Sequence, residues 1–193
     1  MSKAFVFPGQ GSQAVGMGQA LAEASPAARL VFEEVDDALS QNLTKVMFEG
    51  PDNELRLTEN AQPALMAVSM AIVQVLSEEG SVAIDDKADF VAGHSLGEYS
   101  ALAAAGSLAL ADTARLLKLR GQSMQEAVPV GDGAMAALLG LDFDAAKEVA
   151  EEAAEGEVCD VGNDNAPGQV VLSGATAAIE RAVEIAKEKG ARR

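Results

Sequence analysis

Hydrophobic and polar positions follow two different periods along the chain. Short apolar runs that end in proline or glycine predict buried strands at residues 3–7 and 89–93. Apolar positions three and four residues apart predict helices instead. The helices predicted in this way are residues 26–39, 58–76, 96–105 and 110–127. Since helices separate the two strands, this part of the chain is typical of an α/β fold built on a parallel sheet.

The same pattern predicts where single side chains lie. In helix 26–39, Leu30, Val31 and Val35 fall on one face, which we expect to be buried. Thr58 stands at the start of helix 58–76, where a hydroxyl commonly accepts from the free backbone N–H groups. We therefore expect Thr58 to be the N-cap of a mostly buried helix.

A second, smaller unit is predicted after the turn sequence PVGDG at residues 129–133. Its strands and helices come in the order β-α-β-β-α, at residues 134–139, 142–155, 158–164, 169–173 and 175–189. A ferredoxin-like split βαβ sheet has this order, followed by one more strand. We therefore expect residues 1–128 to form part of a large α/β-hydrolase-like subdomain and residues 129–193 to form a small ferredoxin-like α+β subdomain.

Charge and cysteine content narrow the function and the compartment. The 30 acidic and 14 basic residues give a net charge of -16, which is the wrong sign for binding nucleic acid or an anionic membrane. Cys159 is the one cysteine, so no disulfide forms within the chain, as in a reducing cytoplasm. The start, MSKAFVFPGQG, does not read as a signal peptide, and the apolar stretch 61–76 is shorter than the ~20 residues of a membrane span. We expect a cytoplasmic protein that uses no cofactor and, with one histidine and one cysteine far apart, no metal.

Ser95 stands in the pattern G-x-S-x-G, between a predicted strand and a predicted helix. In that context the glycines permit a sharp turn that exposes the serine hydroxyl at the carboxyl end of the strand, as in a nucleophile elbow. The alternative is a serine that only caps the helix. His94 is the one histidine, but adjacent side chains diverge at a tight turn. We therefore expect His94 to be buried and hydrogen-bonded, and not to be the base.

Two further polar residues stand in unusual surroundings. Arg120 lies among apolar positions of helix 110–127, beside Gly121. It either forms a surface salt bridge or points inward, where its planar guanidinium could hold a carboxylate through two hydrogen bonds. Gln10 follows the first strand in the glycine-rich turn PGQGSQ. Its amide, together with the backbone N–H of Leu96, could form an oxyanion hole.

Five segments, in this order, are similar to those of one enzyme family: FVFPGQGSQAVGMG at 5–18, TENAQPAL at 58–65, GHSLGEYSAL at 93–102, LRGQSMQEAVP at 119–129 and NDNAPGQVVLSG at 163–174. Together they resemble malonyl-CoA:acyl-carrier-protein transacylase, an acyltransferase of fatty acid synthesis. The resemblance spans the whole chain. It implies a ping-pong reaction with malonyl-CoA and acyl carrier protein as partners.

The resemblance also assigns roles to single residues. It implies that Ser95 becomes malonylated, that Gln10 and the Leu96 N–H form the oxyanion hole, and that Arg120 binds the malonyl carboxylate. Members of the family are longer, and their catalytic histidine follows the small subdomain. We therefore expect the 193 residues to be a fragment with impaired activity, whose partner is the missing C-terminal segment of the same protein.

Two other functions remain open from the sequence. A serine esterase of the α/β-hydrolase type shares the turn around the serine but needs no carboxylate-binding arginine. A carrier-protein-binding module without catalysis would need no base. Turnover of simple esters favours the first, and carrier binding without acylation of Ser95 favours the second.

Overall fold

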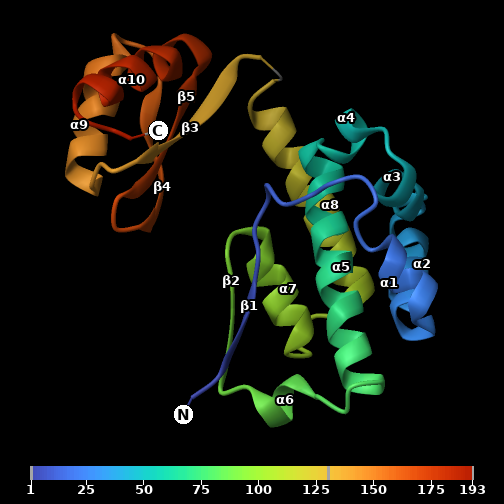
Figure 1. Ribbon diagram of the computed structural model, residues 1–193. Helices are drawn as coiled ribbons and strands as arrows, with labels where there is room; N and C mark the ends of the chain where they lie inside the picture. The colour runs from blue at the N-terminus through green and yellow to red at the C-terminus, as the bar shows by residue number, and fades with distance from the viewer. Residues whose placement is uncertain (1, 130, 193) are drawn as a thin grey trace. The chain divides into compact units, whose positions relative to one another are not determined.

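The computed structural model describes residues 2–129 and 131–192, in two compact units of which one ends at Glu126 and the other begins at Ala127 (Figure 1). The elements up to the end of the first unit are β1 (Ala4–Phe7), α1 (Gln19–Ala24), α2 (Pro26–Leu39), α3 (Leu43–Glu49), α4 (Asp52–Leu55), α5 (Thr58–Glu78), α6 (Ile84–Lys87), β2 (Phe90–Gly93), α7 (Leu96–Ala104) and α8 (Leu110–Ala127). Those that follow are β3 (Gly133–Leu139), α9 (Phe143–Ala154), β4 (Cys159–Ala166), β5 (Gln169–Ala175) and α10 (Thr176–Glu188). The sequence had placed the division two residues later. The turn expected at 129–133 includes Val130, which lies outside the described residues.

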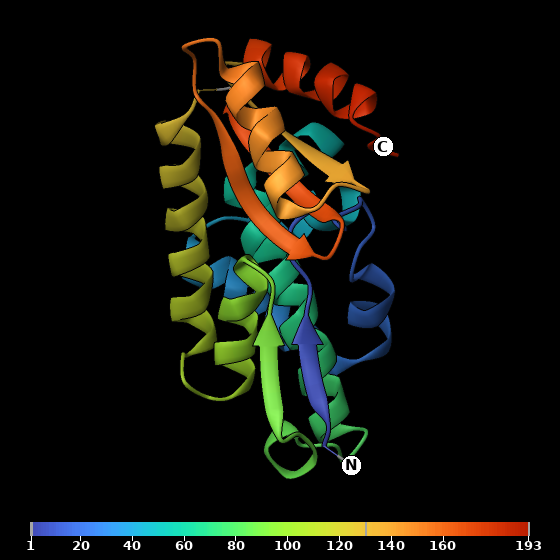
Figure 2. The ribbon, with the colours of Figure 1, turned by 90° about the vertical axis from the view of Figure 1, so that its left-hand side faces the viewer.

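The two strands of the first unit lie side by side and parallel, as Figure 2 shows. Their register pairs Ala4 with Phe90 and Phe7 with Gly93. Both strands therefore end at the same edge, and the turns that follow them meet there. The α/β fold with a parallel sheet that the sequence predicts is confirmed.

The expectation that both strands are buried is wrong. Side chains alternate along each strand, and Val6 and Phe90 are 72% and 64% exposed. Phe5 and Val91 point to the other face, where they pack with apolar residues of α5, α6 and α7. A four-residue apolar strand has the same sequence pattern whether its neighbours cover one face or both.

The core of the first unit forms around α5, with α2 and α7 on either side (Figure 1). By length and composition α5 could cross a membrane, since it has 21 residues, although half of its most apolar window is buried within the structure. The argument that stretch 61–76 is too short to span a membrane is therefore wrong, because the helix continues past both ends of that stretch. Buried Phe32, Leu65 and Met66 belong to the core that it shares with its neighbours, and burying such a side chain stabilises a fold by about 1.5–3 kcal/mol.

Two details of the helices differ from expectation. Leu30 is 63% exposed, because the buried stripe of α2 runs through Val31, Phe32 and Val35. Thr58 is the first residue of α5 and not its N-cap. Its hydroxyl accepts a hydrogen bond from the side chain of Gln10 instead, so it joins the start of α5 to the turn after β1.

The second unit has an antiparallel sheet in the order β3-β5-β4. Val170 and Leu172, two residues apart on β5, are fully buried, whereas Met135 on β3 is 61% exposed. The buried side chains form one cluster with residues of both α9 and α10, so both helices cover the same face. The β-α-β-β-α order predicted from the sequence is the order of these elements.

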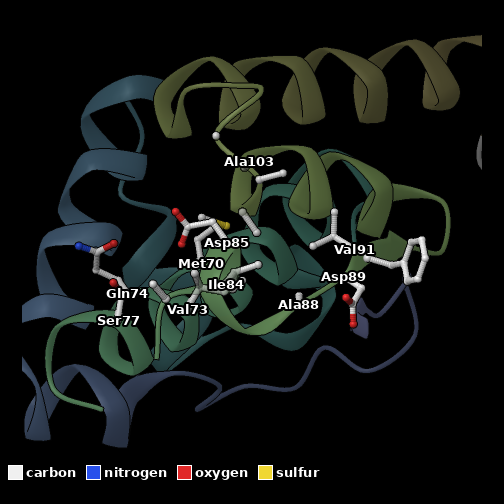
Figure 3. A pocket seen from close by; sticks show the side chains of 15 residues that line it. Met70, Val73, Gln74, Ser77, Ile84, Asp85, Ala88, Asp89, Val91 and Ala103 are labelled. Carbon is white, nitrogen blue, oxygen red and sulfur yellow. The ribbon is translucent and has the colours of Figure 1, made fainter. Parts of the chain in front are cut away.

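A cavity of about 510 Å³ lies between α5, α6, β2 and the end of α7 (Figure 3). Its lining includes Phe90 and Val91, at the start of β2, and Ala104 at the end of α7. Ser95 follows the other end of β2, and none of the residues singled out from the sequence lines this cavity.

Candidate active site

Ser95 occupies the sharp turn between β2 and α7. Its backbone has φ 56° and ψ -114°, a conformation with positive φ that a non-glycine residue adopts at a cost of about 1–3 kcal/mol. Although Ser95 is the N-cap by position, its side chain makes no capping hydrogen bond. Its hydroxyl is exposed and engaged by another helix, so the capping alternative does not describe it.

Three glycines allow the backbone to pack closely around this turn. A Cβ on Gly93 would lie 1.9 Å from the carbonyl carbon of Gly97, and a Cβ on Gly97 would lie 2.4 Å from the carbonyl oxygen of Phe7. A Cβ on Gly9 would lie 2.6 Å from His94 Nδ1. The turns after β1 and β2 are therefore interlocked. At Gly93 and Gly97 the atoms met are backbone, so only glycine fits there.

Arg120 reaches Ser95 from α8. Its Nη2 donates to Ser95 Oγ at 3.0 Å, and its Nη1 donates to Gln62 Oε1 on α5. The guanidinium carbon lies 5.9 Å from the centre of the Tyr99 ring, within the range of a cation–π contact. These partners are neutral, and in the described part of the chain no carboxylate pairs with Arg120. The half-buried guanidinium thus lies beside the serine without a carboxylate partner among the described residues.

The close approach of α8 to the start of α5 directs Arg120 to this place. Gly121 is buried, and a Cβ there would lie 2.4 Å from Glu59 Cα and 2.8 Å from the carbonyl carbon of Thr58. With no side chain between them, the backbones of the two helices touch. Arg120 therefore lies along the flank of this contact, next to Gln62.

The two candidate oxyanion-hole groups lie at the same edge of the sheet. The N–H of Leu96 is the first of α7, where a backbone donor has no acceptor within its own helix. Gln10 is exposed in the turn after β1, and its Nε2 donates to Thr58 Oγ1 at 3.4 Å. Arg120 is thus hydrogen-bonded directly to Ser95, whereas the amide of Gln10 is hydrogen-bonded to Thr58.

The expectation that His94 is buried is wrong, because its side chain is exposed. Its backbone is fixed, since its N–H donates to Phe7 O at 3.2 Å and its carbonyl accepts from Gly97 N. The ring lies against Gly9.

Sequence reasoning missed Gln62 and Tyr99. Gln62 is fully buried within an apolar part of α5, yet its amide oxygen accepts from Arg120. The signal was present, because a polar residue in such a run needs a partner when it is buried. Nothing in the sequence pointed to Tyr99, since a tyrosine in a helix commonly packs in the core.

Comparison with known proteins identifies the family. The model of the acyl transferase domain matches residues 4–193. The malonyl CoA-acyl carrier protein transacylase of Bacillus subtilis is 50% identical over 195 residues, covering 100% of this chain and 60% of the relative. The Escherichia coli K12 protein of the same name is 48% identical over 190 residues, covering 98% of this chain and 60% of the relative. The chain therefore spans about 60% of the length of these relatives.

Solved structures give the same result. The acyl-carrier-protein S-malonyltransferase of Bartonella henselae is 58% identical with a TM-score of 0.94, covering 100% of this chain and 61% of that one. A malonyl-transacylase solved in complex with its type II PKS acyl-carrier protein is 45% identical with a TM-score of 0.92. The match covers 100% of this chain and 61% of that one. The chain with Arg120 against Ser95 at its strand–helix turn belongs to the acyl transferase domain family.

Proposed function

We propose that this chain carries the nucleophile and the acyl-binding groups of a malonyl-CoA:acyl-carrier-protein transacylase. Ser95 is the nucleophile at an elbow of the α/β-hydrolase kind. Arg120 binds the free carboxylate of the malonyl group. The relatives named for this activity, at about half identity, support the assignment.

In the first half-reaction, Ser95 Oγ attacks the thioester carbonyl carbon of malonyl-CoA. The carbonyl oxygen becomes an oxyanion, which the N–H of Leu96 and the amide of Gln10 stabilise. The carbon–sulfur bond then breaks, coenzyme A leaves as its thiol, and Ser95 carries the malonyl ester. The serine proton passes to a base, which then gives it to the leaving sulfur. We place this base in the part of the relatives that this chain does not match.

In the second half-reaction, the phosphopantetheine thiol of acyl carrier protein attacks the malonyl ester and gives its proton to the same base. The ester bond to Ser95 then breaks, and Ser95 Oγ takes the proton back. The oxyanion hole serves both halves, because each passes through a tetrahedral intermediate at the same carbon. The product is a malonyl thioester for fatty acid synthesis, and neither half requires a metal or an organic cofactor.

One observation carries this proposal: the guanidinium of Arg120 is held by Gln62 and Tyr99 at 3.0 Å from Ser95 Oγ, with no carboxylate partner among the described residues. An esterase acting on neutral acyl groups has no use for a half-buried cation there. A carboxylate at the end of a short acyl chain on Ser95 would pair with it. Charge-assisted hydrogen bonds of this kind contribute about 1.5–3 kcal/mol.

The test is the intact mass of the chain after mixing with malonyl-CoA. We expect a malonyl adduct on the parent, none on Ser95→Ala, and labelling slowed about 10- to 100-fold in Arg120→Met, as the loss of about 1.5–3 kcal/mol implies. Arg115→Met is the matched control, because Arg115 is an exposed arginine of the same helix paired with Asp112. Its labelling should equal that of the parent.

Other results would contradict the proposal. A folded parent that gains no adduct, or a Ser95→Ala variant that still gains one, rules out the serine intermediate. Turnover of simple esters without a malonyl adduct indicates the esterase, and tight binding of acyl carrier protein without acylation indicates the binding module.

The finer fold assignment belongs to the same proposal. We assign residues 1–128 to the large subdomain and 129–193 to a ferredoxin-like subdomain. The antiparallel order β3-β5-β4 supports this, as does the bond from Arg192 N to Leu139 O at the outer edge of β3, where a fourth strand would pair. That strand and the later strands of the large sheet belong to the proposed C-terminal partner segment, and the cytoplasm is the proposed compartment.

A further inference from the structure

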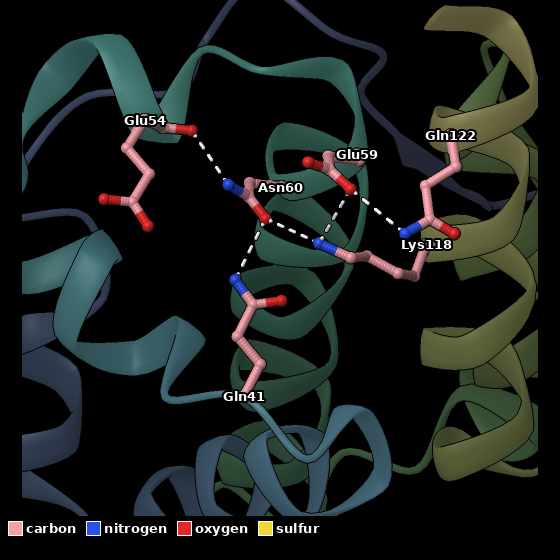
Figure 4. Close-up of polar contacts among 6 residues, drawn as sticks. All are labelled: Gln41, Glu54, Glu59, Asn60, Lys118 and Gln122. Atoms are coloured by element: carbon pink, nitrogen blue, oxygen red, sulfur yellow. Dashed lines mark hydrogen bonds and ion pairs between the residues drawn. The ribbon is translucent and has the colours of Figure 1, made fainter. Parts of the chain in front are cut away.

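A group of charged and amide side chains joins α8 to α5 (Figure 4). By the geometry of a helix, it lies on the side of Gly121 away from Arg120. Lys118 and Gln122 lie one turn apart on α8, and both contact Glu59 of α5. Lys118 Nζ lies 3.1 Å from Glu59 Oε2, and Gln122 Nε2 donates to the same oxygen at 3.1 Å. The Lys118 and Glu59 side chains are only 20% and 32% exposed, so solvent screens this pair less than an ordinary surface pair.

Asn60 extends the contact into the core. It is 3% exposed, and its Oδ1 accepts from Lys118 Nζ at 2.9 Å and from Gln41 Nε2 at 3.0 Å. Its Nδ2 donates to Glu54 O at 3.0 Å. The ammonium of Lys118 is therefore held by two acceptors, one of which is itself fixed by the chain before α5.

The geometry of a helix relates this contact to Arg120. With 3.6 residues per turn, Lys118 and Gln122 project from one flank of Gly121, and Arg120 projects from the other. A rotation of α8 about its own axis by about 10° would move a group about 6 Å from that axis by about 1 Å. Gln62 contacts the Arg120 flank of α8, both at the guanidinium and at Met124 Sδ (3.4 Å), and Tyr99 contacts the guanidinium. Neither residue holds the opposite flank, where Lys118 and Gln122 project.

We propose that Glu59, Asn60, Lys118 and Gln122 form a clamp that sets the rotation of α8 and so positions Arg120 for an acyl carboxylate. This inference rests on the proposed function. The four are positioning residues, since none of them contacts Ser95, and their effect is on the choice of acyl group. Loss of the clamp lowers the preference for malonyl over acetyl and leaves acetylation of Ser95 unchanged.

The test is a competition in which each variant is mixed with equal amounts of malonyl-CoA and acetyl-CoA and the two adducts are measured by intact mass. The ratio of the adducts does not depend on how much protein is folded. We expect it to fall about tenfold in Lys118→Met and in the isosteric Glu59→Gln. It should stay at the parent value in Lys118→Arg, which keeps the cation.

Arg115→Met is the control for general loosening of α8, because Arg115 Nε donates to Ala38 O of α2 and so also ties the helix to the core. A second readout does not need acylation: the rate at which phenylglyoxal modifies Arg120, measured by peptide mass mapping. Lys118→Met and Glu59→Gln should raise this rate severalfold, since the guanidinium leaves Ser95 and Gln62.

An unchanged adduct ratio in both variants overturns the proposal, as does an equal fall in Arg115→Met. If the parent accepts neither acyl group, the proposed function fails. The rate at which phenylglyoxal modifies Arg120 then tests by itself whether the clamp positions this residue. Faster modification in the two variants then supports the clamp, and an unchanged rate overturns it.

Discussion

Gly121→Ala tests whether the close contact between α5 and α8 sets the position of Arg120. The added Cβ would lie 2.4 Å from Glu59 Cα, about 1 Å short of ordinary van der Waals contact. The atoms that it meets belong to the backbone of α5, so no side chain can turn aside. We expect α8 to move away from α5 by about 1 Å and to take the guanidinium of Arg120 with it.

The variant should change activity far more than stability. Overpacking of this kind costs about 1–3 kcal/mol, and the higher helix propensity of alanine offsets about 1 kcal/mol of that. The net loss of unfolding free energy is therefore about 0–2 kcal/mol. A displacement of about 1 Å at a reacting group can lower a rate by about 100-fold, and we expect that loss in the malonylation of Ser95.

Urea unfolding followed by circular dichroism measures the free energy of unfolding, and the rate of adduct formation measures the malonylation of Ser95. Ser123→Ala is the matched control, because Ser123 is exposed on the same helix and alanine there changes only helix propensity. It should label at the parent rate. A folded Gly121→Ala variant that also labels at the parent rate would refute the reasoning.

Three further predictions follow from other contacts. Gly93→Ala brings a Cβ to 1.9 Å from the backbone of Gly97, so it should lower the free energy of unfolding by about 3 kcal/mol or more, and an unchanged urea midpoint would contradict this. The hydrogen bond from Lys118 holds the pKa of Glu59 below its ordinary value of 4.5, so its stabilisation is present above about pH 4.5 and is lost as the pH falls through the lowered pKa. Glu59→Gln should therefore lose less stability than the parent between about pH 5 and pH 3, and equal losses would argue against the ion pair. Burial raises the pKa of the Cys159 thiol, so iodoacetamide should alkylate it severalfold more slowly than in urea-denatured chain at about pH 8, and equal rates would count against that shift.

Long periodic patterns predicted the helices well. The expected ranges 26–39 and 110–127 are those of α2 and α8, because each pattern runs over several turns. The short helices α1 and α3 were not predicted. With 6 and 7 residues, they give fewer than two full turns of periodicity. In addition, α1 begins after Gly18 in a left-handed conformation and not at a recognisable capping residue.

The site was predictable one residue at a time but not as an arrangement. Ser95 could be found from its glycines and its place between a strand and a helix. That Arg120 points to Ser95 could not be found, since 25 residues separate them and the direction depends on the contact of Gly121 with Glu59. The apolar surroundings of Gln62 indicate that it needs a partner, but they do not identify Arg120, which lies on another helix. Solvent exposure depends on which faces neighbouring elements cover. The exposure of His94 and of one face of the two strands could therefore not be predicted from the local sequence.

The interlocked backbone at Gly9, Gly93 and Gly97 limits how this site can be changed by mutation. A library that randomises the whole turn around the serine would lose nearly all members at the two glycines of the motif, whatever acyl group is selected for. Gln62 and Tyr99 lie outside this turn, and variation there alters what surrounds the guanidinium. New acyl preferences in such a scaffold must therefore come from side chains around a serine that stays in place.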